Sequence, residues 1–226
     1  MSLHRNDSRT APAHHLNEEW LMAHAAGSLD EAYALVVACH LDQCAECRES
    51  LALAEALGGV FLENEAPTPV SAGSLDRIMA CIDDPVDDGS PALLPDTASD
   101  LPRPLGQYIG QDIEGLKWRT IGPGVRGVKL APKGRDDSRL WLLRAAPGTP
   151  LPDHGHRGSE LTLILKGNYV WERGVFGPGD VDDTDDEVWH SPLVEAGEEC
   201  ICLVAMDGPL RLKGVFARLL QPVIGI

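Results

Sequence analysis

The 226-residue sequence predicts an α+β protein of two domains, a small all-α helical bundle followed by a β-barrel. Helical periodicity and helix-capping residues dominate the first 65 residues. One short amphipathic segment and then a stretch rich in proline and acidic residues follow, and from residue 139 short apolar runs alternate with glycine and proline. We therefore expect a helical domain over residues 1–85, an acidic proline-rich linker over 86–104 and a β domain over 105–226.

The net charge of −16 is concentrated in the first hundred residues. Residues 1–65 contain eleven acidic and three basic side chains, and residues 66–103 contain seven and two, whereas residues 104–226 contain seventeen and fourteen. An acidic domain is repelled by nucleic acid and attracted to basic surfaces. Direct nucleic-acid binding is therefore disfavoured, although a plain solubilising surface would explain the charge as well.

The sequence contains no apolar run long enough to span a membrane, and its first residues lack the apolar core of a secretory signal. We therefore expect a cytoplasmic protein without a membrane partner. Six cysteines in that compartment indicate metal ligation or redox sensing rather than a disulfide framework.

Two helices are expected within the first 40 residues. Asn17 is suited to cap the first helix and Gly27 to end it. Ser28 and Glu31 have the spacing of a capping box for the second helix. The second helix has a stripe of helical period that ends in a histidine: Leu29, Tyr33, Val36 and His40.

His40, Cys44 and Cys47 are spaced at i, i+4 and i+7, which brings their side chains to one side of a helix. An imidazole and two thiolates at this spacing are three of the four ligands of a tetrahedral zinc site. The two cysteines would open a third helix, whose amino-terminal dipole favours thiolates. The apolar stripe of that helix is expected to share one small core with the metal: Leu51, Ala54 and Leu57.

The fourth ligand should come from the first helix or from just before it. His15 is preferred because it is adjacent to the start of that helix, with His14, His24 and the thiol of Cys39 as alternatives. Four protein ligands leave no open position, so this zinc would be structural and would contribute much of the folding free energy of so small a domain.

Residues 74–82 form a short amphipathic segment that Ser74 can cap. Its apolar residues recur at i, i+3, i+4 and i+7: Leu75, Ile78, Met79 and Ile82. We expect either the first three helices or a partner protein to cover this stripe.

Five runs are expected as strands, at residues 139–144, 160–166, 169–172, 200–206 and 210–216. Lys166, Gly167 and Asn168 resemble a hairpin turn between the second and third of these runs. Cys200 and Cys202 share one face of the fourth run. Core packing is the favoured role for these thiols, and oxidation near a metal is the alternative if that face lines the barrel interior.

A second group of metal-binding residues lies in this β domain. His154, His156 and Glu160 are spaced as in the first motif of the cupins, with Gly148 and Gly167 at the flanking motif positions. His190, ten residues after Asp180, resembles the second cupin motif. Three histidines and one glutamate suit zinc, iron, manganese or nickel.

The second motif departs from the usual cupin pattern, because Asp185 and Glu187 replace a proline and a glycine before His190. Six of the eight residues from Asp180 to Glu187 are acidic, and we expect them to form a solvated loop.

With these two motifs in this order, the chain resembles the ChrR-type zinc-dependent anti-sigma factors. The resemblance is closest in residues 35–47, 152–163 and 200–203. The resemblance implies a protein without enzymatic turnover, whose amino-terminal domain sequesters an extracytoplasmic-function sigma factor. It also implies that the cupin domain releases this partner in response to oxidants such as singlet oxygen. It assigns one zinc to His15, His40, Cys44 and Cys47, and a second zinc to His154, His156, Glu160 and His190.

The alternative is a cupin metalloenzyme, such as a dioxygenase, with the helical domain as an accessory. One zinc and one iron per chain would favour this enzyme, whereas about two zinc ions per chain would favour the regulator.

Overall fold

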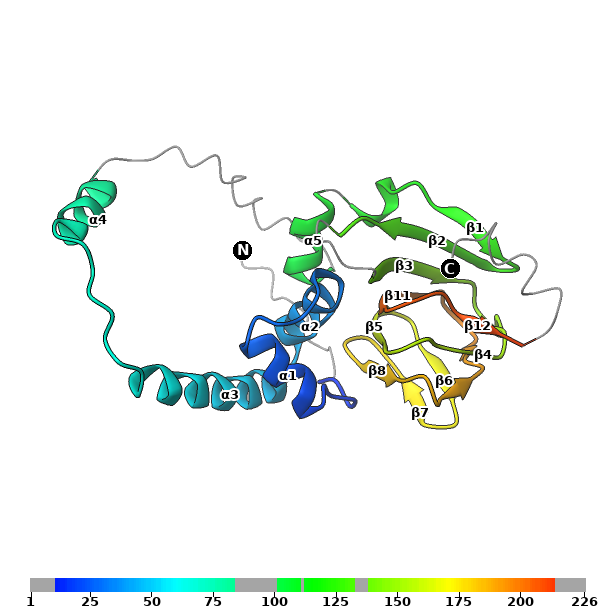
Figure 1. The fold of residues 1–226 in the computed structure, drawn as a ribbon. Coiled ribbons are helices and arrows are strands. Elements are labelled where there is room, and N and C mark those ends of the chain that lie inside the picture. Colours follow the sequence, from blue (N-terminus) through cyan, green and yellow to red (C-terminus); the bar gives the residue numbers. More distant parts are fainter. Residues whose placement is uncertain (1–10, 84–100, 111, 133–137, 214–226) are drawn as a thin grey trace, which may run out of the picture.

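The computed structural model describes residues 11–83, 101–110, 112–132 and 138–213. A helical part and a β-rich part lie against each other, and one long helix projects away from both (Figure 1). Within the described residues, no helix has both the length and the apolar character that a membrane span requires.

Three helices make up the start of the chain: α1 (Glu18–Ala25), α2 (Glu31–Gln43) and α3 (Ala45–Glu63). The side chain of Asn17 accepts a hydrogen bond from the backbone N–H of Trp20, and Gly27 follows α1 with a φ of 64°, so both predicted ends of this helix are confirmed. The predicted capping box is wrong. Asp30 precedes α2, and the hydroxyl of Ser28 donates to the Ala23 carbonyl at the end of α1.

Two further helices and a 3-10 turn follow: α4 (Ser74–Asp83), α5 (Arg103–Ile109) and η1 (Ile113–Gly115). The sequence pattern did not predict α5, which packs against α2. The backbone N–H of Arg103 donates to Asp42 at 3.0 Å, and Leu105 is fully buried.

The largest sheet of the β-rich part is antiparallel, with the strand order β1-β2-β3-β11-β5-β8. Its strands are β1 (Arg119–Gly122), β2 (Val125–Leu130), β3 (Arg139–Ala145), β11 (Cys200–Met206), β5 (Glu160–Lys166) and β8 (Val181–Thr184). The expected strands over 160–166 and 200–206 are confirmed.

Two smaller sheets complete the β-rich part. They contain β10 (Leu193–Val194), β6 (Tyr169–Trp171) and β7 (Gly174–Phe176), and β12 (Arg211–Leu212), β4 (His154–Gly155) and β9 (Trp189–His190). The described strands therefore form three sheets that are not closed into one barrel. The expected strand over 210–216 is reduced to β12, and residues 214–216 lie outside the described residues.

The turn at Gly167 is not a hairpin, because β5 and β6 on its two sides belong to different sheets. Gly167 has a φ of 66°, and a Cβ there would clash with the carbonyl of Glu199. Glycine therefore lets the chain cross from one sheet to another close beneath the residue that precedes β11.

The helical and β-rich parts share one core, because α2 packs on β5 and β11. Val36 and Val37 of α2 are fully buried and belong to the same apolar cluster as Leu203 of β11. Alternate residues of β11 point the other way, into a second cluster with Ile164 and Tyr169. The prediction that the helices enclose a separate small core is therefore wrong.

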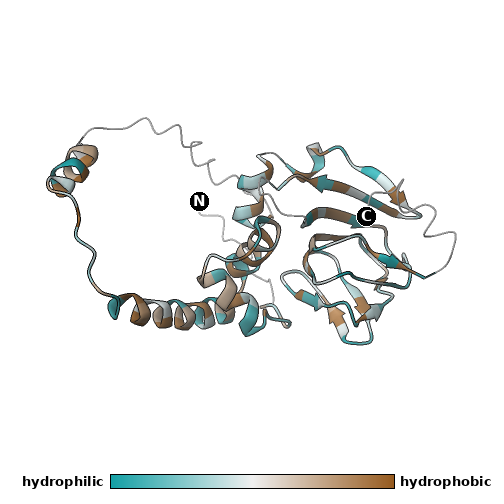
Figure 2. Cartoon of the chain, viewed as in Figure 1, coloured by the Kyte–Doolittle hydropathy of each residue, from teal (hydrophilic) through white to brown (hydrophobic). Residues whose placement is uncertain are grey.

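Beyond its first turns, α3 leaves this core. Leu51 is half-buried, but Leu57 and Phe61 are exposed, so the predicted inward stripe of α3 is wrong over its outer half. The stripe of α4 is also exposed, and the first three helices do not cover it. Figure 2 shows hydrophobic colouring along these projecting helices.

Candidate metal centres

Four side chains converge where α1, α2 and α3 meet. His15 precedes α1, His40 lies in the last turn of α2, and Cys44 and Cys47 lie at the start of α3. Their potential ligand atoms all lie within 4.8 Å of one another. His40 Nε2 is 3.2 Å from Cys47 Sγ, and His15 Nδ1 is 3.3 Å from Cys44 Sγ. We call these four residues the helical metal group.

This geometry fits zinc. Nitrogen and sulfur atoms bound to one zinc ion at ~2.0–2.3 Å are separated by about 3.3–3.8 Å in a tetrahedral site. Burial and the neighbouring Cys44 raise the pKa of Cys47 to about 11, so the helix terminus alone does not produce the expected thiolate. A divalent cation supplies the positive charge that deprotonates such a thiol.

A polar contact orients each of the two imidazoles. Nδ1 of the fully buried His40 lies 2.8 Å from the carbonyl oxygen of Gly179. Since a carbonyl can only accept, Nδ1 carries the proton and Nε2 presents its lone pair to the group. Nε2 of His15 similarly lies 3.3 Å from a carboxylate oxygen of Glu46, which leaves its Nδ1 facing Cys44. Burial lowers the pKa of His40 to about 4, so this ring is neutral.

The alternative fourth ligands lie elsewhere. His14 pairs with the carboxylate of Asp180 at 3.2 Å and stacks on Phe176. Cys39 is buried beside α5, and burial raises its pKa to about 12. Neither these residues nor His24 belongs to a metal-binding group among the described residues.

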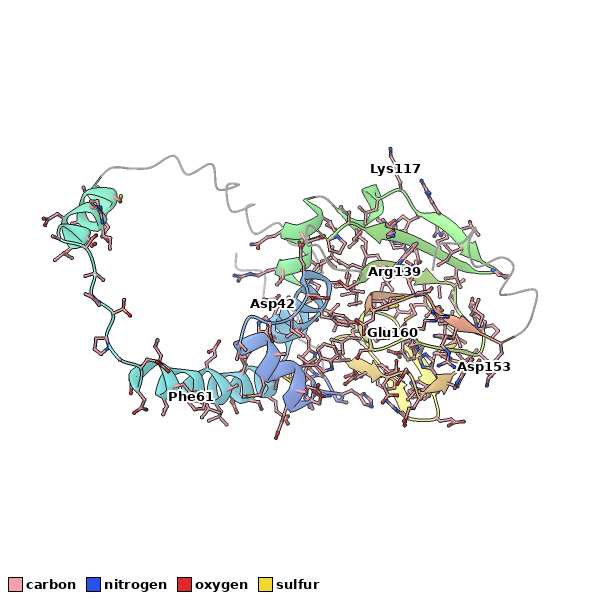
Figure 3. The ribbon with its side chains drawn as sticks, viewed as in Figure 1. Asp42, Phe61, Lys117, Arg139, Asp153 and Glu160 are labelled. Carbon is pink, nitrogen blue, oxygen red and sulfur yellow. The ribbon has the colours of Figure 1, made fainter. Side chains whose placement is uncertain are left out.

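The second group lies inside the β-rich part, where Figure 3 labels Glu160. His154 of β4, His156, Glu160 of β5 and His190 of β9 are all buried, with their potential ligand atoms within 4.8 Å of one another. Nε2 of His190 is 2.9 Å from Nε2 of His154 and 3.1 Å from Nε2 of His156. We call these four residues the cupin metal group.

A cation fits between these side chains. Nδ1 of His154 donates to the Pro152 carbonyl at 2.7 Å, which leaves the lone pair on Nε2. Burial lowers the pKa of His190 to about 3, and it also lowers the pKa of His154. Burial alone would raise the pKa of Glu160, but the hydrogen bond and charge of His156 outweigh it and keep the pKa below its usual value. Three imidazoles and one carboxylate form a donor set for a divalent metal.

Cys200 and Cys202 share one face of β11, as expected, and both are buried in the second apolar cluster. Burial raises the pKa of Cys200 to about 12 and that of Cys202 well above its usual value. Neither thiol belongs to a metal group. These environments favour core packing over reactivity.

The acidic run before His190 is not a solvated loop at its start. Asp182 of β8 is buried and accepts hydrogen bonds from Tyr169 Oη and Trp171 Nε1, both at 2.8 Å. Asp183 accepts from Trp20 Nε1 at 2.9 Å, across the contact with α1. The charge of this run alone did not predict these roles. Side chains of β8 alternate between the two faces of the sheet, so Val181 and Asp182 face opposite apolar clusters.

The fold and the two groups define a cupin-like protein with a His/Cys helical module before it. A family model described as the ChrR cupin-like domain matches residues 107–210. The anti-sigma-E factor ChrR of Cereibacter sphaeroides is 43% identical over 213 residues, which are 94% of this chain and 98% of that protein. The crystal structure of Rhodobacter sphaeroides SigE in complex with the anti-sigma ChrR matches with a TM-score of 0.75 and 43% identity, covering 86% of this chain and 98% of that one.

The chain therefore belongs to the ChrR family of anti-sigma factors. The family resemblance inferred from the two motifs is confirmed. Membership defines the chain as a regulatory protein and not an enzyme, which sets aside the alternative of a cupin dioxygenase.

Proposed function

We propose that this chain sequesters an extracytoplasmic-function sigma factor through residues 1–85, and that residues 105–226 control release. Residues 86–104 link the two domains. The chain binds this partner in the cytoplasm, where RNA polymerase acts. SigE in complex with a ChrR relative that is 43% identical supports this class of partner.

The observation that carries the proposal is the apolar surface of α3, α4 and the segment between them. Ten of the thirteen exposed large hydrophobic side chains in the described residues lie here, so the exposure is concentrated rather than scattered. They are Leu53, Leu57, Val60, Phe61, Leu62, Val70, Leu75, Ile78, Met79 and Ile82. Exposed apolar side chains in this concentration indicate a protein-binding site. We call it the outer apolar surface.

The chemistry of this surface fits a sigma factor. Apolar stripes at helical spacing pack against grooves or helices of a partner. The eleven acidic residues among residues 1–65 complement the basic surfaces with which a sigma factor contacts DNA. The partner would cover α4 and complete the all-α bundle that the sequence predicts.

The helical metal group would hold a structural zinc through His15, His40, Cys44 and Cys47. Zinc at this position joins the segment before α1 to the ends of α2 and α3, and so fixes the direction in which α3 leaves the core. The group has no open position for a substrate.

The cupin metal group would hold a second zinc or another divalent metal through His154, His156, Glu160 and His190, within a jelly-roll barrel. We assign to this domain the response to oxidants such as singlet oxygen. Its buried donor set, separate from the outer apolar surface, allows a change there without direct contact with the partner.

An in vitro transcription assay tests the proposal. Purified chain would be titrated into reactions driven by RNA polymerase and each member of a panel of extracytoplasmic-function sigma factors, including SigE of Rhodobacter sphaeroides. We expect inhibition of one sigma factor at near-stoichiometric concentration, by a chain that contains about two zinc ions. Inhibition of none, with the metal present and the chain folded, would contradict the proposal.

A further inference from the structure

The turn at residues 177–180, which precedes β8, is hydrogen-bonded to the segment that carries His15. Asp180 Oδ1 accepts hydrogen bonds from the backbone N–H groups of Ala13 at 2.6 Å and His14 at 3.0 Å. Asp180 Oδ2 lies 3.2 Å from His14 Nδ1 and accepts from the N–H of Gly177 at 2.8 Å. Asp180 is buried. One carboxylate of the cupin domain therefore fixes the two residues immediately before His15.

The same turn also contacts His40. The Gly179 carbonyl accepts the Nδ1 proton of this ring at 2.8 Å. Gly179 has a φ of 93°, and a Cβ there would lie 2.9 Å from Cγ of Pro12. Glycine therefore allows the turn to come close to the segment before α1.

Two of the four residues in the helical metal group are thus held from the cupin domain, through a turn that contributes no ligand itself. Partners of this kind, which orient ligating imidazoles, strongly influence metal affinity. The backbone of residues 13–14 has a further bond to this region, since the N–H of Val181 donates to the His14 carbonyl at 3.3 Å.

We propose that residues 177–181 of the cupin domain are the outer shell of the helical metal site, with Gly179 and Asp180 as positioning residues for His40 and His15. This inference rests on the proposed zinc site. It assigns to the cupin domain a direct part in metal retention by the domain that binds the partner. Loosening the turn would therefore speed metal loss without removing a ligand.

Cobalt replacement tests this in the full-length protein. A thiolate-to-cobalt charge-transfer band reports the helical metal group alone, because the cupin metal group contains no cysteine. Excess EDTA would be added to the cobalt protein and the decay of the band followed. We expect Asp180→Ala to retain the band and to lose it about tenfold faster than the wild type, with Asp180→Asn in between.

Two further variants make the test specific. His14→Ala removes the contact of its imidazole with Asp180 from the helical side and leaves the hydrogen bond between Asp180 and the Gly177 N–H in place. It should also accelerate the loss, with a starting spectrum like that of the wild type because His14 is no ligand. Tyr33→Phe is the matched control. It removes interdomain hydrogen bonds to Ser159 and Asp207 but touches neither imidazole of the group, so it should decay at the wild-type rate.

The inference is overturned if Asp180→Ala and His14→Ala decay within twofold of the wild type, or if Tyr33→Phe is as fast as they are. If Asp180→Ala does not fold, the decay rate of the cobalt band in His14→Ala alone tests the inference. A wild-type chain without a thiolate band would show instead that the zinc assignment is wrong, and the inference would fall with it. A wild-type band with unchanged variants leaves the proposed function intact and rejects only the role of the turn.

Discussion

At the scale of single residues, sequence spacing predicted which candidate ligands lie together wherever those residues are close in the chain. His40, Cys44 and Cys47 are close in sequence, although the chain passes from α2 to α3 at the extended residue Cys44. His154 and His156 alternate along one extended segment. The position of His15 depended on tertiary contact, because this residue precedes α1 and is held by a turn more than 160 residues away along the chain. Spacing could not choose among its rivals.

The first prediction concerns Cys44. Cys44→Ser should reduce the metal content from about two ions per chain to one and abolish inhibition of the sigma factor, because the proposed zinc joins the segment before α1 to α2 and α3 and so positions the outer apolar surface. Metal analysis and the transcription assay would measure both effects.

Cys39→Ala is the matched control, a thiol on the neighbouring turn of α2 that lies outside the group. It should keep both metals and the inhibition. Loss of one metal in Cys39→Ala would show that the ligand assignment is wrong.

The second prediction concerns Asp182. Burial raises its pKa from 3.8 to about 6. Between these values the folded chain keeps a proton that the unfolded chain has lost, so wild-type stability should fall as the pH rises through this window, by about 2 kcal/mol. Because the amide of Asp182→Asn does not titrate, the free energy of unfolding of this variant should not show that decrease.

Urea unfolding of the two proteins, at one zinc concentration and across that pH range, measures the difference in their free energies of unfolding. A difference that does not change with pH would show that this carboxylate titrates normally.

At the scale of elements, helix and strand positions were largely predictable, and their pairing was not. The strands over 160–166 and 200–206 and the ends of α1 matched local patterns. Ser28 failed as a cap because its hydroxyl bonds backward to α1. The Gly167 turn failed as a hairpin because the strands on its two sides join different sheets, a choice made by long-range pairing.

The third prediction concerns α4. Ile78→Asp combined with Ile82→Asp should weaken sigma binding by about 30-fold or more, the effect of losing a buried interface anchor. Both side chains are exposed in the free chain, so metal content and thermal stability should be unchanged.

Asp76→Asn on the same helix is the control and should bind normally. Isothermal titration with the purified sigma factor measures the affinities. Normal affinity of the double variant would exclude α4 from the interface.

At the scale of the whole molecule, the sequence predicted two domains joined by a linker, and the structure adds extensive contact between them. Residues of α2, β5 and β11 form one apolar cluster. This contact was not predictable, because an apolar stripe on α2 fits burial against either helices or a sheet. Strand β8 begins next to Asp180 at the helical metal group, and its Thr184 pairs with Glu160 of the cupin metal group.

The fourth prediction separates the two metal groups. His154→Ala should still inhibit the sigma factor but should release it less readily after exposure to singlet oxygen, because it alters only the cupin metal group. Transcription measured with and without a photosensitiser and light would show this. If His154→Ala abolished inhibition as completely as Cys44→Ser, the division of labour between the domains would be wrong.

The central claim is that the helical domain alone binds the sigma factor, and inhibition by residues 1–85 tests it most directly. This fragment lacks the turn at Asp180, so the assay requires saturating zinc. We predict that the zinc-loaded fragment inhibits sigma-dependent transcription at the same molar ratio as the full chain. A fragment that is folded and contains zinc, yet leaves transcription uninhibited, would contradict the account.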